Sequence, residues 1–369
     1  MNFGKIQRWP VLFLVVTALF SALYATAARA NSAAGQSAGL RPPARGFKSN
    51  ARLGAGGPVI DVWYGTYQVF GQLGVPQQWV NILGNVSDPD GVGTLVYALN
   101  GGPASSLSIG PDGKRLVSPG DFNIEIDYQD LLVGPNQVVI TATDQLANSS
   151  VVTVTVEWVG NRPWPQPYTI DWSTVGAISE VAQIVDGEWT LEADSVRPAV
   201  MGYDRLIAIG EMAWKDFEVE VPITIHALQE PNDGGVGIIL RWQGHFQEAN
   251  EQPRTGWWNI GAYGYYRDGD HLALRLDKSD PLQDPSVQLA FGTPYIFKMR
   301  VTGTLGEYKL KVWEQGQPEP AAWNMTAQDD SRDLASGSVL LVAHKVDASF
   351  GDVTIRPLSF DIFLPVVQR

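Results

Sequence analysis

The residues best suited to bind a ligand lie on three consecutive strand-like segments near the middle of the chain. Between residues 257 and 267, alternation places aromatic and amide side chains on one side of a strand. We expect the polar sides of the preceding and following segments to coincide with it. Aromatic rings edged with amide and guanidinium donors suit sugars, whose C–H faces stack on rings while their hydroxyl groups form hydrogen bonds. The predicted ligand-binding residues are Arg241, Gln243, Trp257, Asn259, Tyr263, Tyr265, His271 and Arg275.

The alternative interpretation is that these aromatic residues fill the core between two packed sheets. Aromatic side chains contribute strongly to cores as well as to binding surfaces, so their presence alone does not separate the two. If Trp257, Tyr263 and Tyr265 are sealed between the layers, no binding surface is left on this segment.

The sequence predicts no catalytic centre. The four histidines lack the His-Glu-x-x-His and His-x-His spacings of zinc enzymes. The chain has no cysteine, which excludes thiol catalysis, disulfides and thiolate zinc sites. Glu248 and Glu251 lie in the long polar connection 244–255, which we interpret as a solvated rim loop, with an acid/base pair as the alternative.

The elements that must position these residues are β-strands. Short alternating runs separated by turn signals occur throughout, and no window predicts a long amphipathic helix. Two β-sandwiches, over 57–159 and 168–358, are the simplest architecture, with a semi-rigid proline-rich linker over 160–167. The predicted strands are Gln78–Leu83, Thr94–Leu99, Phe122–Tyr128, Gln137–Ala142 and Val151–Trp158, then Phe217–Ile225, Val236–Gln243, Trp257–Arg267, His271–Leu276, Tyr295–Val301, Tyr308–Trp313, Val339–Ala343 and Val353–Ile355.

The segment 57–159 resembles bacterial immunoglobulin-like domains. The resemblance lies in Gly120-Asp121-Phe122-Asn123-Ile124, Gly134-Pro135-Asn136 and Ile140-Thr141-Ala142-Thr143-Asp144. It implies an immunoglobulin-like β-sandwich that serves as a spacer, because these motifs are structural ones.

The segment 168–358 resembles concanavalin A-like jelly-roll domains, in particular laminin-G-like modules and the sugar-hydrolase domains that act on 3-keto-disaccharides. Families on this fold include lectins, glycosidases and adhesion modules, so the resemblance does not choose among them. It implies a structural calcium near the last strand, with Asp352 in the matching position. The resemblance is carried by Asp186-Gly187-Glu188-Trp189, Asp216-Phe217-Glu218-Val219, Gly237-Ile238-Ile239-Leu240-Arg241-Trp242 and Phe350-Gly351-Asp352-Val353.

Two acidic motifs lie in the first segment. Glu125-Ile126-Asp127-Tyr128-Gln129-Asp130 resembles the Glu-x-Asp-x-x-Glu strand of jelly-roll glucanases but ends in the shorter Asp130. We interpret it as a solvated strand face. Asp88 and Asp90 stand in an Asp-Pro-Asp-Gly turn and are alternative calcium ligands.

The first thirty residues have the three parts of a secretory signal. Lys5 and Arg8 precede a largely apolar stretch over 11–25, and Ala28-Arg29-Ala30 is a cleavage motif. The apolar stretch is shorter than the ~20 residues of a stable membrane span, with a retained anchor as the alternative. We expect bacterial-type export to the medium or cell surface, a disordered linker over 31–56 and an apolar tail over 359–369. The tail either docks as a last edge strand or directs surface sorting.

The charge of the chain limits its partners. The formal net charge is −13, and without residues 1–30 the chain keeps 23 basic and 39 acidic residues, a net charge of −16. Such a surface repels nucleic acid and anionic membranes. The sequence therefore predicts an exported, all-β, non-catalytic carbohydrate-binding or adhesion protein. We expect its partner to be a neutral glycan or cell-surface polysaccharide, and we expect no membrane insertion after signal removal. A glycoside-active hydrolase and a structural envelope protein without a small ligand are the alternatives.

Overall fold

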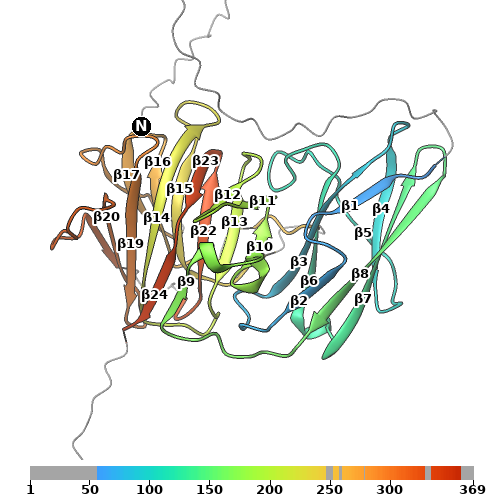
Figure 1. Cartoon of the computed structure of the whole chain (residues 1–369), viewed down its shortest axis with the longest axis horizontal. Coiled ribbons are helices and arrows are strands. Elements are labelled where there is room, and N and C mark those ends of the chain that lie inside the picture. The colour runs from blue at the N-terminus through green and yellow to red at the C-terminus, as the bar shows by residue number, and fades with distance from the viewer. Residues whose placement is uncertain (1–55, 247–251, 257–259, 278, 329–333, 359–369) are drawn as a thin grey trace, which may run out of the picture. The chain divides into compact units, whose positions relative to one another are not determined.

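The computed structural model describes residues 56–246, 252–256, 260–277, 279–328 and 334–358, and it consists almost entirely of strands and their connections (Figure 1). The predicted signal segment, nearly all of the predicted linker 31–56 and the predicted tail lie outside the described residues. Both predicted sandwiches belong to one compact unit, residues 51–369.

Helical structure in the described ranges is confined to three single turns of 3₁₀-helix, at Tyr128–Asp130 (η1), Trp172–Thr174 (η2) and Ile178–Glu180 (η3). Within these ranges no helix is long and apolar enough to cross a membrane. The prediction of an all-β protein is confirmed.

Residues 59–158 form a sandwich of two sheets. One sheet has the strand order β1-β3-β6 and the other the order β2-β8-β7-β4-β5, in which β2 runs parallel to β8. Between them lies a core that includes Val80, Ile82, Ile124, Val138 and Ile140. The strands are β1 (Val59–Val62), β2 (Tyr67–Phe70), β3 (Trp79–Ser87), β4 (Val92–Leu99), β5 (Ser105–Ser106), β6 (Asp121–Asp127), β7 (Gly134–Asp144) and β8 (Ser149–Trp158).

Residues 168–357 form a second and larger sandwich. Its seven-stranded sheet has the order β10-β13-β22-β15-β16-β17-β18. Its nine-stranded sheet has the order β11-β12-β23-β14-β19-β20-β21, with β24 paired to β14 and β9 paired to β24. The strands are β9 (Tyr168–Ile170), β10 (Gln183–Asp186), β11 (Trp189–Leu191), β12 (Val196–Pro198), β13 (Arg205–Ile209), β14 (Phe217–Leu228), β15 (Gly235–Trp242), β16 (Ala262–Arg267), β17 (His271–Leu276), β18 (Leu282–Asp284), β19 (Pro294–Thr302), β20 (Glu307–Glu314), β21 (Met325–Gln328), β22 (Ser338–His344), β23 (Val346–Phe350) and β24 (Val353–Pro357).

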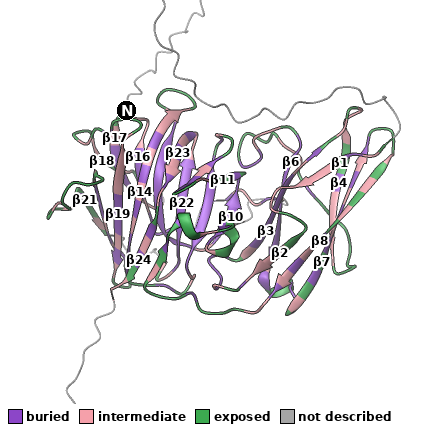
Figure 2. Ribbon diagram, in the orientation of Figure 1, coloured by how far each residue is buried: buried purple, intermediate pink, exposed green. Residues whose placement is uncertain are grey.

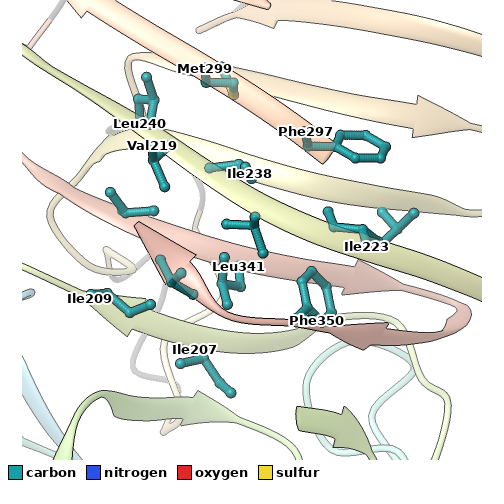
Figure 3. Close-up of a cluster of buried hydrophobic side chains, with 14 of the residues drawn as sticks. Ile207, Ile209, Val219, Ile223, Ile238, Leu240, Phe297, Met299, Leu341 and Phe350 are labelled. Carbon is teal, nitrogen blue, oxygen red and sulfur yellow. The ribbon is translucent and has the colours of Figure 1, made fainter. Parts of the chain in front are cut away.

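Alternate residues of the two large sheets meet in one continuous core (Figure 3). The inner row of the seven-stranded sheet includes Ile207, Ile238 and Leu341, and Val219 and Phe297 face it from the nine-stranded sheet. These side chains are at most 1% exposed, and β22 is buried along nearly its whole length (Figure 2). Burial of apolar surface at this interface is the main stabilising contribution that the fold offers.

The predicted strands are present, usually one to three residues longer at their ends. The predicted strand at His271–Leu276 has the observed bounds. In the predicted strand Trp257–Arg267, residues 257–259 lie outside the described residues, and the observed strand β16 begins only at Ala262, two residues later than the described part of the prediction. Phe217, Val219, Val221 and Ile223 alternate along β14 and all point into the core. The shortest strands were not predicted, because two to five residues are too few to show a period of two. They are β1, β2, β5, β9 to β13, β18, β21 and β23.

The predicted strand Val236–Gln243 does not alternate regularly after Leu240. Arg241 has a φ of 58°, and the register between β15 and β22 shifts between Leu240 and Trp242. This β-bulge turns Trp242 away from the main core into a separate buried cluster that contains Ile239. Arg241, expected on the polar face, is fully buried instead.

The proline-rich segment 160–167 is packed against the second sandwich. The Trp164 ring is 5% exposed and makes edge contacts with Tyr168 and Trp214. Its backbone N–H donates to Glu211 Oε1 at 2.7 Å. The segment is therefore ordered by its contacts as well as by its prolines.

The substitution Phe297→Ala tests the inter-sheet core. Phe297 is fully buried, so its truncation should lower the free energy of unfolding by about 3–5 kcal/mol through lost burial and a residual cavity. Chemical denaturation measures this, with Phe291→Ala as the control because Phe291 is 45% exposed. Equal losses in the two variants would contradict the assignment of the core.

Candidate ligand-binding site

The outer face of the seven-stranded sheet carries the residues of the candidate site. In β16, Tyr263, Tyr265 and Arg267 point to this face because their neighbours Ala262 and Tyr266 belong to the core. The antiparallel register places Tyr263 beside Arg275 of β17. The polar sides of β16 and β17 therefore coincide as predicted, on the outside of the sandwich.

Two tyrosines lie flat against each other on this face. The rings of Tyr263 and Tyr265 stack with centroids 4.1 Å apart and an angle of 5° between their planes. The neighbouring strand leaves room for them, since a Cβ added at Gly235 would lie 3.0 Å from the Tyr265 ring and 3.4 Å from the Tyr263 hydroxyl oxygen. That hydroxyl is buried and makes no hydrogen bond to a described residue. Burial raises the pKa of both tyrosines.

A hollow of about 400 Å³ opens beside this pair. Ligand pockets in proteins usually have volumes of about 300–1,000 Å³. Tyr203, which was not predicted, stands at its edge with 39% of its surface exposed and its ring edge-on to the His344 ring at 4.6 Å. The described residues that line the hollow are Tyr203, Asp204, Asp233, Gly234, Gly235, Ile239, Ile260, Tyr263, Tyr265, Arg267, Asp268, Arg275, Asp277, Val342 and His344.

The charges around the hollow are largely paired. Asp204 is 4% exposed and accepts a hydrogen bond from His344 Nδ1 at 2.8 Å. Burial raises the pKa of Asp204, although His344 opposes the shift. Arg267 Nε lies 3.0 Å from Asp268 Oδ2. Arg275 is exposed and makes no hydrogen bond or ion pair with another described residue.

Lys345 and Asp233 form a further ion pair at the rim of the hollow. The Lys345 ammonium also lies 5.8 Å from the centre of the Tyr203 ring. Contacts between three loops therefore hold the rim, and these loops carry Tyr203, Asp233 and Lys345.

Three of the eight predicted ligand-binding residues line the hollow, namely Tyr263, Tyr265 and Arg275. His271 lies on the same face, paired with Asp270, but does not line the hollow. The other described ones point elsewhere. Arg241 donates to the carbonyl oxygens of Leu334 and Gly303 at 2.7 Å, and Gln243 donates to that of Ser336 at 2.9 Å. The remaining two, Trp257 and Asn259, lie outside the described residues.

The residues that were not predicted come from a loop and from the end of a strand. Tyr203 and Asp204 precede β13, and His344 ends β22. Their positions in the sequence carry no periodic signal, because the hollow joins them through strand pairing rather than through spacing along the chain. Only the paired register of β13, β22 and β15 shows that they are neighbours.

Asp352 lines a second hollow, of about 390 Å³, together with residues that include Glu192, His226 and Ser349. Asp352 Oδ1 accepts a hydrogen bond from the Trp172 backbone N–H at 3.1 Å. His226 Nε2 and Ser349 Oγ are 2.8 Å apart. The metal predicted at Asp352 remains a prediction.

In the part of the chain that the structure describes, one group of three carboxylates could hold a metal ion. Oxygen atoms of Asp88, Asp90 and Asp144 lie within 4.8 Å of one another. Asp144 Oδ1 already accepts backbone N–H groups of Leu146 and Asn148 at 2.8 Å. Carboxylate oxygens are the ligands that calcium prefers, so the group fits a weak calcium site.

The glucanase-like motif is not a solvated strand face at its first carboxylate. Glu125 is 1% exposed, and its Oε1 lies 2.6 Å from Nη1 of the buried Arg115. Arg115 Nε also lies 2.7 Å from Asp186 Oδ2 of the second sandwich. The expectation was therefore wrong for Glu125, because ion pairs with Arg115 and with Arg254, whose Nη1 lies 3.3 Å from Glu125 Oε2, remove it from solvent. Glu248 and Glu251 lie outside the described residues.

No family model and no curated protein matches the chain. Among solved structures, the carbohydrate-binding module CBM66 from Bacillus subtilis is 16% identical, with a TM-score of 0.35, over 47% of this chain and 94% of that chain. The Emp46p carbohydrate recognition domain is 12% identical, with a TM-score of 0.39, over 53% and 98%. The calcium- and mannose-bound VIP36 exoplasmic/lumenal domain is 12% identical, with a TM-score of 0.38, over 54% and 93%. With TM-scores below 0.5, these similarities carry no weight for the site.

Calcium should raise the melting temperature of the chain through the group of Asp88, Asp90 and Asp144. An extracellular-type site with Kd of 10⁻⁴–10⁻³ M would add about 1.4–2.7 kcal/mol at about 10 mM calcium. Thermal unfolding should show the increase in the wild type and in Asp352→Asn, and lose it in Asp90→Asn. No increase in the wild type would exclude the site, and a loss confined to Asp352→Asn would move it to the second sandwich.

Asp186 should make stability depend on pH. Burial raises its pKa from 3.8 to about 6 although Arg115 opposes the shift, so the folded state binds the proton more tightly than the unfolded state. The stability that this proton contributes is complete below pH 3.8 and is lost as the pH rises through about 6. Over this range the unfolding free energy of the wild type, relative to Asp186→Asn, should fall by up to about 1.4 kcal/mol per pH unit.

Denaturant titrations at a series of pH values measure this difference. Asp194→Asn, the same change at an exposed position, controls for the altered net charge. If the unfolding free energy of the wild type relative to Asp186→Asn instead rose with pH, Arg115 and not burial would determine the direction of the pKa shift of Asp186.

Proposed function

We propose that the chain binds a neutral carbohydrate, without catalysis, in the hollow on the outer face of the seven-stranded sheet. The observation that carries this proposal is the combination of Tyr203 and Arg275 on one open hollow with carboxylates within it. The Tyr203 ring offers an exposed aromatic surface for a C–H face. Arg275 supplies free hydrogen-bond donors, and the Asp204 and Asp268 carboxylates supply acceptors.

The charge balance supports a neutral ligand. Asp204, Asp233 and Asp268 each have a basic partner, so the hollow offers no large field of either sign. An acidic sugar would gain Arg275 as a partner, but it would also approach a chain with a strongly negative net charge. Hydroxyl groups can use both the donors and the acceptors present without bringing a charge.

A glycoside hydrolase is the second candidate function. Asp204 favours it, because burial raises the pKa of this carboxyl and Asp277 lines the same hollow. Glycoside hydrolysis requires an acid with a raised pKa and a second carboxylate in the same site. The Asp204–His344 hydrogen bond makes binding the preferred proposal, because it occupies the carboxylate that would have to donate the proton. Release of reducing sugar from the bound glycan would establish the hydrolase instead.

The proposal includes the fold families of the two sandwiches. The order β8-β7-β4 and the parallel pair β2 and β8 support an immunoglobulin-like first sandwich. Two large antiparallel sheets packed face to face support a concanavalin A-like second sandwich. The proposal also includes export to the cell surface or medium, with a neutral glycan or polysaccharide as partner.

A glycan array probed with the purified full chain tests the function. We expect signals on neutral glycans and none on acidic polysaccharides. A separate binding assay with nucleic acid should also detect no binding. If no neutral glycan binds, the hypothesis of a structural envelope protein without a small ligand is favoured.

Tyr203→Ala and Arg275→Ala should each weaken binding of the strongest array glycan about 5- to 30-fold, which corresponds to about 1–2 kcal/mol for a lost ring or hydrogen-bond contact. Isothermal titration calorimetry measures the Kd. Tyr67→Ala and Arg162→Ala are the matched controls, because both residues are exposed and neither lines the hollow. Undiminished affinity in both Tyr203→Ala and Arg275→Ala would place the ligand elsewhere.

A further inference from the structure

A loop of the first sandwich is anchored in the second. This loop, residues 107–120, connects β5 and β6 and carries the buried Arg115. Arg115 donates to Asp186 Oδ2 at 2.7 Å and to the Val185 carbonyl oxygen at 3.2 Å. Its own carbonyl oxygen accepts a hydrogen bond from Arg205 Nη2 at 3.3 Å. The loop is therefore tied to both β10 and the start of β13.

Two residues further along, Val117 packs against the backbone at Gly202. A Cβ added at Gly202 would lie 2.3 Å from Val117 Cγ2 and 2.5 Å from Arg205 Nη2. Contacts this short do not occur between real atoms, so any side chain at position 202 would force Val117 or Arg205 to move. On the other side, the Gly202 carbonyl oxygen accepts the Lys345 backbone N–H at 2.6 Å.

The residues next to Gly202 line the hollow. Tyr203 packs its ring against His344, and Asp204 forms the hydrogen bond to the same imidazole. Arg205, which closes the segment, is 3% exposed. A continuous set of packed groups thus runs from Val117 to the aromatic edge of the hollow, and each step is a direct contact.

We propose that Arg115 and Val117 are positioning residues for the hollow, and that the first sandwich is part of the binding unit and not only a spacer. This proposal rests on the proposed function for its effect on affinity, but the positioning itself does not need a ligand. By fixing Gly202, the loop sets where Tyr203 and Asp204 stand relative to His344. A change at Val117 should therefore reach the hollow although Val117 does not line it.

Proton NMR of the histidine rings in the ligand-free full chain tests the positioning. The chain has four histidines, so few imidazole signals need to be resolved. Tyr203→Ala removes the ring against His344 and identifies its signal, and His226 is an internal reference on the nine-stranded sheet. We expect Val117→Ala to move the His344 signal while the His226 signal stays in place.

The matched control is Val133→Ala, because Val133 is 78% exposed in the first sandwich and does not line the hollow. A general loss of stability would not shift the signals of the folded state, so the readout separates positioning from structural support. An unchanged His344 signal in Val117→Ala, with a clear shift in Tyr203→Ala, would overturn the proposal.

Gly202→Ala provides a second test from the opposite side of the contact. The added methyl group should displace the segment and move the same His344 signal. In the double variant with Val117→Ala the clash with Val117 Cγ2 is absent, so the signal should return part of the way toward its original position. Additive shifts in the double variant would show that the two residues do not act through one contact.

Affinity separates this proposal from the proposed function. For the strongest array glycan, Val117→Ala should raise the Kd between about two- and thirtyfold, and Val133→Ala should leave it unchanged. If no glycan binds but His344 still responds to Val117→Ala, the function fails and the positioning stands. If a glycan binds with equal Kd in Val117→Ala and wild type, the proposed role in binding fails and the function stands.

Discussion

The structure depends on the burial of one face of each large sheet against the other. Side chains alternate along a strand, so the inward row of Ile238 and Leu240 commits the intervening residues of β15 to the outer face. The same holds for β16, where Ala262 and Tyr266 enter the core and Tyr263 and Tyr265 are left outside. The apolar core thus determines which residues of β16 face outward and line the hollow.

Local departures from regular β-structure give the outer face its shape. The bulge at Arg241 moves Trp242 to the outer side, where it helps to fill a buried cluster at one end of the sheet. Gly235 lacks a side chain where the Tyr265 ring needs space, and Gly237 lacks one where the backbone of β16 approaches closely. The hollow on this face includes both Tyr203 and Arg275 in its lining.

Buried charge joins the two sandwiches. Arg115, Glu125 and Asp186 are all nearly inaccessible to solvent, and an unpaired charge in such a place would be strongly unfavourable. The guanidinium is satisfied only when both sandwiches are in place, because its two carboxylate partners come one from each. Such pairs contribute little net stability compared with apolar contacts, but they demand one geometry. That geometry also holds the loop that reaches Gly202 and the edge of the hollow.

The sequence by itself determined the all-β class, most of the longer strands and the side of β16 and β17 on which the polar residues lie, because a period of two is a local property. It also placed Tyr263, Tyr265 and Arg275 correctly on one face. Only the tertiary structure decided that Arg241 is buried and that Tyr203, Asp204 and His344 join the hollow. A bulge inserts one residue without a sequence period, and strand pairing brings together residues more than a hundred positions apart.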